Sequence, residues 1–336
     1  NNFFVAFVLI VASCSDSNKS TNLEVSLHDK PLLEVQIQPR SLPNPNKNAY
    51  YGDLHVHTEN SFDAYTFGTI STPADAYKYA QGYPIQHPSG YLIQLSKPLD
   101  FYAVTDHGIF MGLMKEAADT SSKFSQYEFT KPLHNLNESA STGFFSLIKR
   151  QGLFRPFGEE VRAGLEDGSI DLSLILEVGR TVWQKTIKAA DDAYMPGTFT
   201  TFAAYEYTPS LDLYNNYLHR NVIFKDTKNL PAQLFTRNNS QDPEDLWDWM
   251  NQLRSNGVES LAIPHNTNIS GGAAFSLNDY HGGPIDEEYA KNRALNEPLV
   301  EITQVKGTSE THPLLSKNDE WAAFEAKTGV EAEKLV

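Results

Sequence analysis

The stretch that decides the fold is Tyr51-Gly52-Asp53-Leu54-His55-Val56-His57-Thr58. Leu54 and Val56 alternate with His55 and His57, and this period of two predicts a strand with one apolar face and one face carrying two imidazoles. Because residues i and i+2 of a strand project from the same face, both imidazoles can reach one small ion. An isolated His-x-His pair also fits two structural histidines, so the rest of the chain has to decide.

A βαβ unit is predicted to follow. Thr72 and Pro73 mark the start of a helix that ends before Gly82. After a hairpin-like insert over residues 83–98, residues 99–105 are predicted to form a strand that ends in Asp106-His107-Gly108. Polar, metal-type side chains thus lie where both strands end, which is the carboxyl edge at which βαβ folds carry their chemistry.

Residues 109–195 are predicted to form a helical insert, with Ser169 capping a long helix over residues 169–190. The insert is either a lid that selects substrate or a packing insertion. Strands are predicted to resume after the insert, and three of them carry a candidate ligand at one end. These strands are 198–207 with Glu206, 219–224 with His219, 260–265 with His265, and 299–303. Asp242 is predicted to open a further helix that Gly257 closes.

Composition narrows the function. The chain has 336 residues, 40% of them hydrophobic, which is enough for one large core or two domains. A net charge of −15 argues against an extended basic face for nucleic acid, although bound cations would let an acidic chain hold a phosphorylated small molecule. The sequence contains no Gly-x-Ser-x-Gly elbow and no phosphate-binding Gly-rich loop, and it offers no catalytic cysteine once Cys14 is lipidated.

The N-terminal residues predict export. Residues 3–12 form an apolar run that is too short to span a bilayer and suits a signal peptide. Val11-Ala12-Ser13-Cys14 resembles a bacterial lipobox, so we expect a signal peptide over residues 1–14 and a lipid on Cys14, the only cysteine. The alternative is a buried N-terminal strand. With a lipid on Cys14, residues 15–48 would be a tether to a periplasmic or outer-membrane-anchored domain over residues 49–336, which would contact the membrane only through the lipid.

Half of the ten histidines fall at predicted strand edges, together with Glu206 and Asp106. The five are His55, His57, His107, His219 and His265. Structural histidines should scatter over helices, loops and termini, as the other five do. Imidazoles with one bridging carboxylate suit divalent Zn, Mn or Fe better than Ca or Mg. The set therefore predicts a multi-metal site.

These motifs resemble those of the PHP (polymerase and histidinol phosphatase) superfamily over residues 50 to about 305. The matching segments are Asp53-Leu54-His55-Val56-His57-Thr58, Thr105-Asp106-His107-Gly108, Tyr205-Glu206, His219 and Pro264-His265-Asn266. Within the superfamily, the chain most resembles a group of exported PHP-like proteins with a long helical insert. The resemblance implies an α/β fold, a distorted (β/α)7 TIM-like barrel.

The resemblance also implies two or three divalent metal ions. His55 and His57 would hold one, Glu206 would bridge to a second held by His219 and His265, and His107 would help to hold a third. Two features depart from the family pattern: Asp63 stands near the place of a further histidine, and the closing Asp-x-His motif is absent before residue 336. We therefore expect a truncated chain whose barrel is incomplete at its C-terminus. In a complete chain, the first metal ion would lack a carboxylate ligand and would bind weakly.

Two further residues are candidates for the chemistry. Asp106 is expected to orient a metal-ligand histidine or to accept a proton. Arg220, next to His219, is either a clamp for a phosphate or an exposed arginine at a strand end. Together these expectations describe an exported metal-dependent hydrolase, a phosphoesterase that activates water at a di- or trinuclear centre. The alternatives are a metal hydrolase of amide or lactone bonds and a non-catalytic surface lipoprotein that binds metal or ligand.

Overall fold

The computed structural model describes residues 33–35, 44–45, 47–138, 144–210, 216–309, 317–318 and 320. All of them belong to the second of two compact units, residues 32–336. The predicted signal peptide with Cys14 and the C-terminal residues 321–336 lie outside the described part, as does most of the predicted tether. Among the described residues, no helix combines the length and the apolar character needed to cross a membrane.

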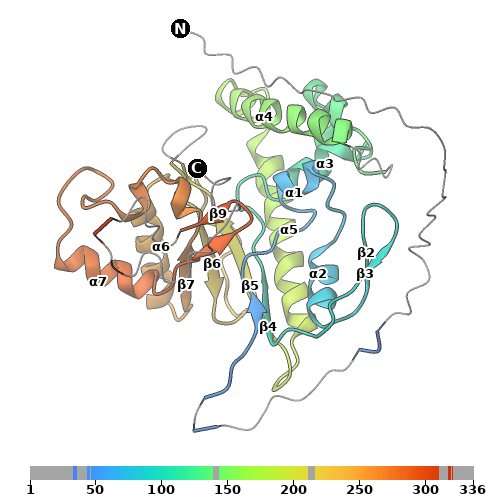
Figure 1. Ribbon diagram of the computed structural model, residues 1–336. Coiled ribbons are helices and arrows are strands. Elements are labelled where there is room, and N and C mark those ends of the chain that lie inside the picture. The colour runs from blue at the N-terminus through green and yellow to red at the C-terminus, as the bar shows by residue number, and fades with distance from the viewer. Residues whose placement is uncertain are drawn as a thin grey trace, which may run out of the picture. The chain divides into compact units, whose positions relative to one another are not determined.

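Five strands form one curled sheet in the order β1-β4-β5-β6-β7 (Figure 1). They are β1 (Gly52–Asp53), β4 (Phe101–Val104), β5 (Thr200–Tyr207), β6 (Arg220–Phe224) and β7 (Ser260–Pro264). β1, β4 and β5 run parallel, whereas β6 runs antiparallel to both β5 and β7. The predicted α/β class is confirmed, with the sheet curled like half of a barrel.

The direction of β6 differs from that of a strand in an all-parallel barrel. Its register pairs Tyr207 with Arg220 and Arg220 with Pro264, so the start of β6 lies beside the ends of β5 and β7. His219, which precedes β6, therefore lies at the same edge as Glu206 and His265. In an all-parallel sheet the start of β6 would lie at the opposite edge.

Two predicted strands are shorter than expected. In residues 51–58 only β1 joins the ladder, although Thr105 N still donates to Val56 O at 2.7 Å and keeps the chain extended. Residues 299–303 do not form a barrel strand, because a single backbone hydrogen bond, from Glu301 N to Pro264 O at 3.0 Å, ties them to β7. Instead, β8 (Thr303–Gln304) pairs with β9 (Gly307–Thr308) as a hairpin.

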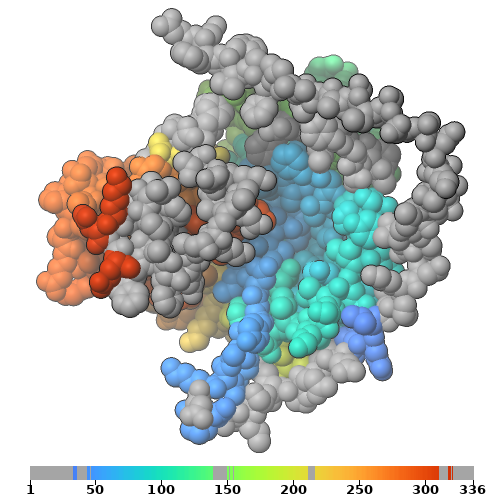
Figure 2. Space-filling model, viewed as in Figure 1, coloured from blue at the N-terminus to red at the C-terminus, as the bar shows by residue number. Residues whose placement is uncertain are grey.

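Helix α2 (Pro73–Ala80) begins as predicted. Thr72 accepts a hydrogen bond from Asp75 N, and the Asp75 carboxylate accepts one from Thr72 N, which forms a capping box. Gly82 adopts a φ of +87° at the exit, where a side chain would be strained. β2 (Ile85–Gln86) and β3 (Leu92–Ile93) then form the predicted hairpin. β1 pairs with β4 and not with this hairpin, and in Figure 2 the blue chain around β1 runs beside teal chain.

The predicted insert is helical. It contains α3 (Leu113–Ala118), η1 (Phe124–Gln126), η2 (Glu128–Leu133), α4 (Phe144–Glu166) and α5 (Leu172–Ala193). The N-cap of α5 is Asp171, which accepts a hydrogen bond from Ser173 N, and not Ser169 as predicted. Both α3 and α4 pack against α1 (Phe62–Thr66), the short helix that follows the His-x-His stretch. The insert is thus attached next to the candidate site.

The main core lies between the sheet and helices α5 and α6. Trp183 of α5 packs with Tyr205 and Phe224 of the sheet, and Leu246 and Met250 of α6 complete the cluster. α6 (Pro243–Ser255) begins at Asp242 as predicted, and Gly257 follows it with a φ of +84°. The chain continues through η3 (Thr267–Ile269), η4 (Ala273–Phe275) and α7 (Glu287–Asn296).

Candidate metal centre

The carboxylate of Glu206, near the end of β5, is the middle of the site. Its side chain is only 1% exposed. Ring nitrogens of all five predicted histidines surround it. Around Oε2 they are His57 Nε2 at 3.1 Å and His55 Nε2 at 3.7 Å, and around Oε1 they are His219 Nδ1 at 2.8 Å, His265 Nε2 at 3.3 Å and His107 Nδ1 at 3.3 Å.

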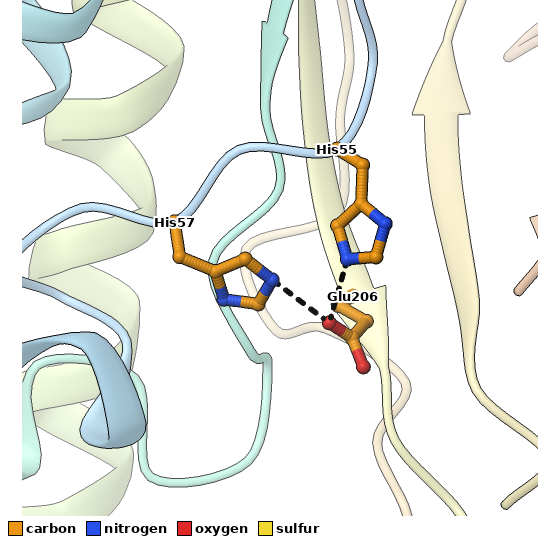
Figure 3. Close-up of side chains that lie close together, drawn as sticks. All are labelled: His55, His57 and Glu206. Atoms are coloured by element: carbon orange, nitrogen blue, oxygen red, sulfur yellow. Dashed lines mark ion pairs between the residues drawn. The ribbon is translucent and has the colours of Figure 1, made fainter. Parts of the chain in front are cut away.

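The His-x-His stretch supplies its two imidazoles as the period-two pattern predicts. Figure 3 shows His55 and His57 pointing from the extended chain toward the same oxygen of Glu206. His265 directly follows β7, the strand farthest from β1 in the order of the sheet. The next residue, Asn266, turns the chain with a φ of +55°. The structure therefore brings all six predicted ligands together, although they come from the ends of five different strands.

The described residues contain three groups whose donor atoms lie within 4.8 Å of one another and could hold a metal ion. The groups are His55-His57-Glu206, Glu206-His219-His265 and His57-Asp63-His107. Glu206 belongs to two of them, as does His57. Such shared donors are what a site with neighbouring ions requires.

Unpaired nitrogen atoms give an independent test of the fit. Within the described residues, His265 Nδ1 is buried without a hydrogen-bond partner. His219 Nδ1 and His265 Nε2 are also buried, and although they lie 2.8 and 3.3 Å from Glu206 Oε1, neither has the geometry of a hydrogen bond. A buried polar atom left unpaired costs about 1–3 kcal/mol, so native structures rarely keep one without a partner of some kind. A cation bound by these nitrogens would remove that cost, and the donor set fits one.

The remaining three imidazoles are held through Nδ1, which in His55 and His57 is the nitrogen away from Glu206 and in His107 also lies 3.3 Å from Glu206 Oε1. His57 Nδ1 lies 2.6 Å from Ser61 Oγ, His107 Nδ1 lies 2.6 Å from Thr208 Oγ1, and His55 Nδ1 lies 2.6 Å from Glu301 Oε2. For His55 and His57 this contact leaves Nε2 free to face Glu206, and for His107 it leaves Nε2 facing Asp63 at 3.3 Å. Contacts of this kind fix the orientation of metal-binding imidazoles.

Electrostatics draw positive charge into the site. Burial disfavours the imidazolium form of His55, but hydrogen bonds to Glu206 and Glu301 outweigh it and raise the pKa to about 9. At His107, Glu206 and Asp63 likewise outweigh burial and raise the pKa to about 10. At His265 burial dominates and lowers the pKa to about 3, so that this ring is neutral. Protons on some rings thus offset the carboxylates, and a metal ion would replace them.

Glu206 itself stays ionised. Burial alone would raise the pKa of its carboxyl group, but the surrounding His107, His265 and His219 hold it well below its usual range. An ionised, buried carboxylate that accepts from several directions can bridge two cations. This is the role that the sequence resemblance assigns to Glu206.

Asp63 and Glu301 are site residues that the sequence analysis did not assign. Asp63 lies in the first turn of α1, with Oδ2 3.3 Å from His107 Nε2 and Oδ1 3.7 Å from His57 Nδ1. Its distance from the His-x-His motif was the available signal, because it stands near the position where a further histidine was expected. Glu301 carried a weaker signal, as the one carboxylate in the predicted strand 299–303.

Asp106 and Arg220 are placed outside the ring of imidazoles. Both oxygens of the buried Asp106 accept hydrogen bonds from Thr58, at 2.6 Å from its N–H and 2.6 Å from its hydroxyl. Arg220 is buried, and its guanidinium binds the Glu297 carboxylate and the Leu218 carbonyl. Because Nε and Nη1 of Arg220 bind groups of the fold and the residue is only 2% exposed, Arg220 fits neither the phosphate clamp nor the exposed arginine that the sequence suggested.

Comparison with known proteins identifies a family for this chain. Residues 44–335 match the model of a family described as "Protein of unknown function (DUF3604)". No curated protein and no solved structure matches the chain. Since the family description names no activity, the function has to be argued from the geometry of the site.

Proposed function

The chain belongs to the family described as protein of unknown function (DUF3604), and from its own geometry we propose that it is a metal-dependent hydrolase of phosphoesters, with the active centre of a PHP-type barrel. One observation carries the proposal: the buried Glu206 carboxylate has five imidazoles around it, and some of their nitrogens have no other described partner. Such an arrangement is costly unless a cation completes it.

The residues that would hold ions are the three groups around Glu206 and His57. Imidazole-rich sets with carboxylates favour Zn, Mn or Fe. Divalent ions about 3.5–4 Å apart lower the pKa of a bound water and polarise a phosphoryl oxygen. The chain contributes by holding the donors rigidly: Glu206 by burial, and the imidazoles of His57 and His107 through Ser61 and Thr208.

Charge favours an anionic ester over a neutral amide or lactone. Two divalent ions carry four positive charges, and the carboxylates next to the imidazoles, Asp63, Glu206 and Glu301, supply three negative ones. The loaded centre would keep a net positive charge although the whole chain is acidic, and that charge would attract a phosphate group. The distorted TIM-like barrel, the export and the lipid on Cys14 belong to the same proposal and rest on the sequence motifs.

A phosphatase assay with matched histidine variants tests the proposal. The purified protein loaded with Mn²⁺ or Zn²⁺ should hydrolyse an aryl phosphate or a bis-aryl phosphate, and His57→Ala and Glu206→Gln should abolish turnover. His87→Ala is the matched control, because His87 stacks on Tyr91 in the hairpin insert away from the centre.

Other outcomes would favour the alternatives. Turnover of an amide or lactone without turnover of phosphoesters would assign the centre to a different class of hydrolase. Stoichiometric metal without turnover of any ester, amide or lactone would favour a metal- or ligand-binding protein. Neither metal nor turnover in the folded protein would contradict the proposal.

A further inference from the structure

Glu301 reaches the centre from a segment distant in sequence and is held there at several points. Its backbone N–H donates to Pro264 O at 3.0 Å, which places it beside the end of β7. Its Oε1 accepts from Gln304 Nε2 at 2.7 Å, and its Oε2 lies 2.6 Å from His55 Nδ1. Both carboxylate oxygens therefore have fixed partners.

The hairpin that carries Gln304 is docked in turn. Asn268, in η3 just after β7, donates from Nδ2 to Lys306 O at 3.2 Å and from its backbone to Ser309 Oγ at 3.2 Å. The tip of this hairpin is exposed at Val305 and Lys306. The β8–β9 hairpin is thus fixed to the loop after β7, and through Gln304 it holds Glu301, which precedes it, beside the centre.

The geometry separates a positioning role from a ligand role for Glu301. An ionised carboxylate only accepts, so the short contact requires a proton on His55 Nδ1. In the neutral ring, the form that would bind a metal ion, that proton leaves Nε2 as the lone-pair nitrogen, and Nε2 is the atom that faces Glu206 at 3.7 Å. Glu301 contacts the ring on the side away from Glu206, where it orients the imidazole.

His55 also differs from its neighbours in the kind of partner it has. The 2.6 Å partner of Nδ1 is a neutral hydroxyl in His57 and His107, from Ser61 and Thr208, whereas in His55 it is a carboxylate. The carboxylates near the other two Nδ1 atoms are farther away, with Asp63 Oδ1 3.7 Å from His57 and Glu206 Oε1 3.3 Å from His107. A carboxylate behind a ligating imidazole fixes the tautomer and also increases the basicity of the inner nitrogen. A hydroxyl also orients the imidazole, but because it carries no charge it increases the basicity of the inner nitrogen much less.

We propose that Glu301, held by Gln304, is the positioning carboxylate of His55, and that the β8–β9 hairpin thereby sets the metal affinity of the His55-His57-Glu206 group. The inference rests on the metal centre of the proposed function but not on the reaction. Removing a carboxylate of this kind lowers metal affinity by about 10–100-fold.

Zinc affinity of hairpin variants, measured by competition with a chromophoric chelator, tests the proposal. Glu301→Ala should bind the first zinc about 10–100-fold more weakly. Glu301→Gln, which keeps an acceptor but not the charge, should fall between Glu301→Ala and the native protein, and Gln304→Ala should show a smaller loss. Thr303→Ala, an exposed position of the same hairpin, should bind like the native protein.

A spectroscopic signature separates positioning from a general structural effect. With ¹⁵N-labelled histidine, the native protein should show a strongly hydrogen-bonded Nδ1 proton that is lost in both His55→Ala and Glu301→Ala. Persistence of that signal in Glu301→Ala, or unchanged zinc affinity, would overturn the proposal. If the native protein binds no zinc, the metal centre fails and this inference fails with it. If affinity falls as expected but no ester is turned over, only the hydrolase function fails.

Discussion

Asp106 shows how a buried charge next to the centre can serve the fold. Its carboxylate is fully buried, and burial raises its pKa. Both of its oxygens are occupied by Thr58, the residue directly after His57. Asp106 therefore fixes the direction in which the chain leaves the His-x-His stretch, and its effect on the imidazoles is indirect.

Removing this carboxylate should destabilise the protein. In Asp106→Ala the N–H and hydroxyl of Thr58 lose their acceptors inside the core, which should cost about 1–3 kcal/mol in the free energy of unfolding. Asp106→Asn keeps one acceptor for the N–H and should cost less. Urea unfolding at constant m-value measures both. Native-like unfolding of Asp106→Ala combined with a loss of zinc binding would show instead that Asp106 acts directly at the metal.

The predicted and missed site residues differ in the kind of signal they carry. His55, His57, His107, Glu206, His219 and His265 could be predicted because each stands at the end of a periodic segment, and histidine is uncommon. Asp63 and Glu301 could not be assigned in the same way, because exposed acidic residues are common in any chain. The partner of Glu301 also lies 246 positions away, at His55, so their contact depends on tertiary structure.

Helix α6 carries a titratable cap that is independent of the metal centre. Asp242 accepts a hydrogen bond from Glu244 N at 2.8 Å, and the residue is only 3% exposed. Burial, with the nearby Glu244 and Asp245 carboxylates, raises the pKa of Asp242 to about 6, although His281 acts in the opposite direction. The protonated form of Asp242 is thus more favoured in the folded protein than in the unfolded chain.

This shift predicts a pH-dependent stability. A carboxyl group whose folded pKa is raised contributes stability below its unfolded pKa of about 3.9, and the contribution is lost as pH rises through about 6. Asp242→Asn keeps the capping oxygen without the charge. Its melting temperature relative to the native protein should therefore rise between pH 4 and pH 7, measured in EDTA.

Two controls make the prediction about Asp242 specific. Asp242→Ala loses the cap and should be less stable by about 1 kcal/mol at pH 4, where the charge is absent. A difference in melting temperature between Asp242→Asn and the native protein that stays constant from pH 4 to pH 7 would show that the carboxylate is not the titrating group. Both scans are made without metal, so that the imidazoles of the centre titrate in the same way in every variant and cancel in the comparison.

Helix starts can be predicted from local sequence, whereas the pairing of strands cannot. The starts of α2 and α6 were correct because Thr72-Pro73 and Asp242-Pro243 determine a cap locally. Ser169 and Asp171 are both capping residues two positions apart, so the pattern could not choose between them. The apolar residues of 299–303 predicted a strand, but a strand needs a neighbour, and only one bond to β7 forms.

The direction of β6 illustrates the same limit for the whole sheet. Residues 219–224 predict a strand, but an apolar period reads the same in either direction. Only the register with β5 and β7 shows that β6 is antiparallel and that His219 lies at the edge of the other ligands. The centre is therefore complete only when β1, β4, β5, β6 and β7 are all assembled.

Because the ligands span the sheet, metal should stabilise the molecule as a whole. A ligand that binds only the folded state at 100 times its Kd adds about 2.7 kcal/mol to the free energy of unfolding. For a domain of this size that corresponds to a rise of about 4–5 °C in Tm. Zn²⁺ or Mn²⁺ should produce this rise in the metal-stripped protein, and EDTA should reverse it.

The choice of metal and of variant shows whether such a rise comes from the Glu206 centre. Mg²⁺ and Ca²⁺ prefer oxygen donors, so at equal concentration they should raise Tm much less than Zn²⁺ does at a centre rich in imidazole. His57 belongs to two of the three ligand groups, so His57→Ala should lose most of the zinc-induced rise while His87→Ala keeps it. Histidines of the unfolded chain also bind zinc weakly, which reduces the rise equally in both variants and leaves their difference as the measure. An equal rise in the two variants would place the bound zinc elsewhere on the protein.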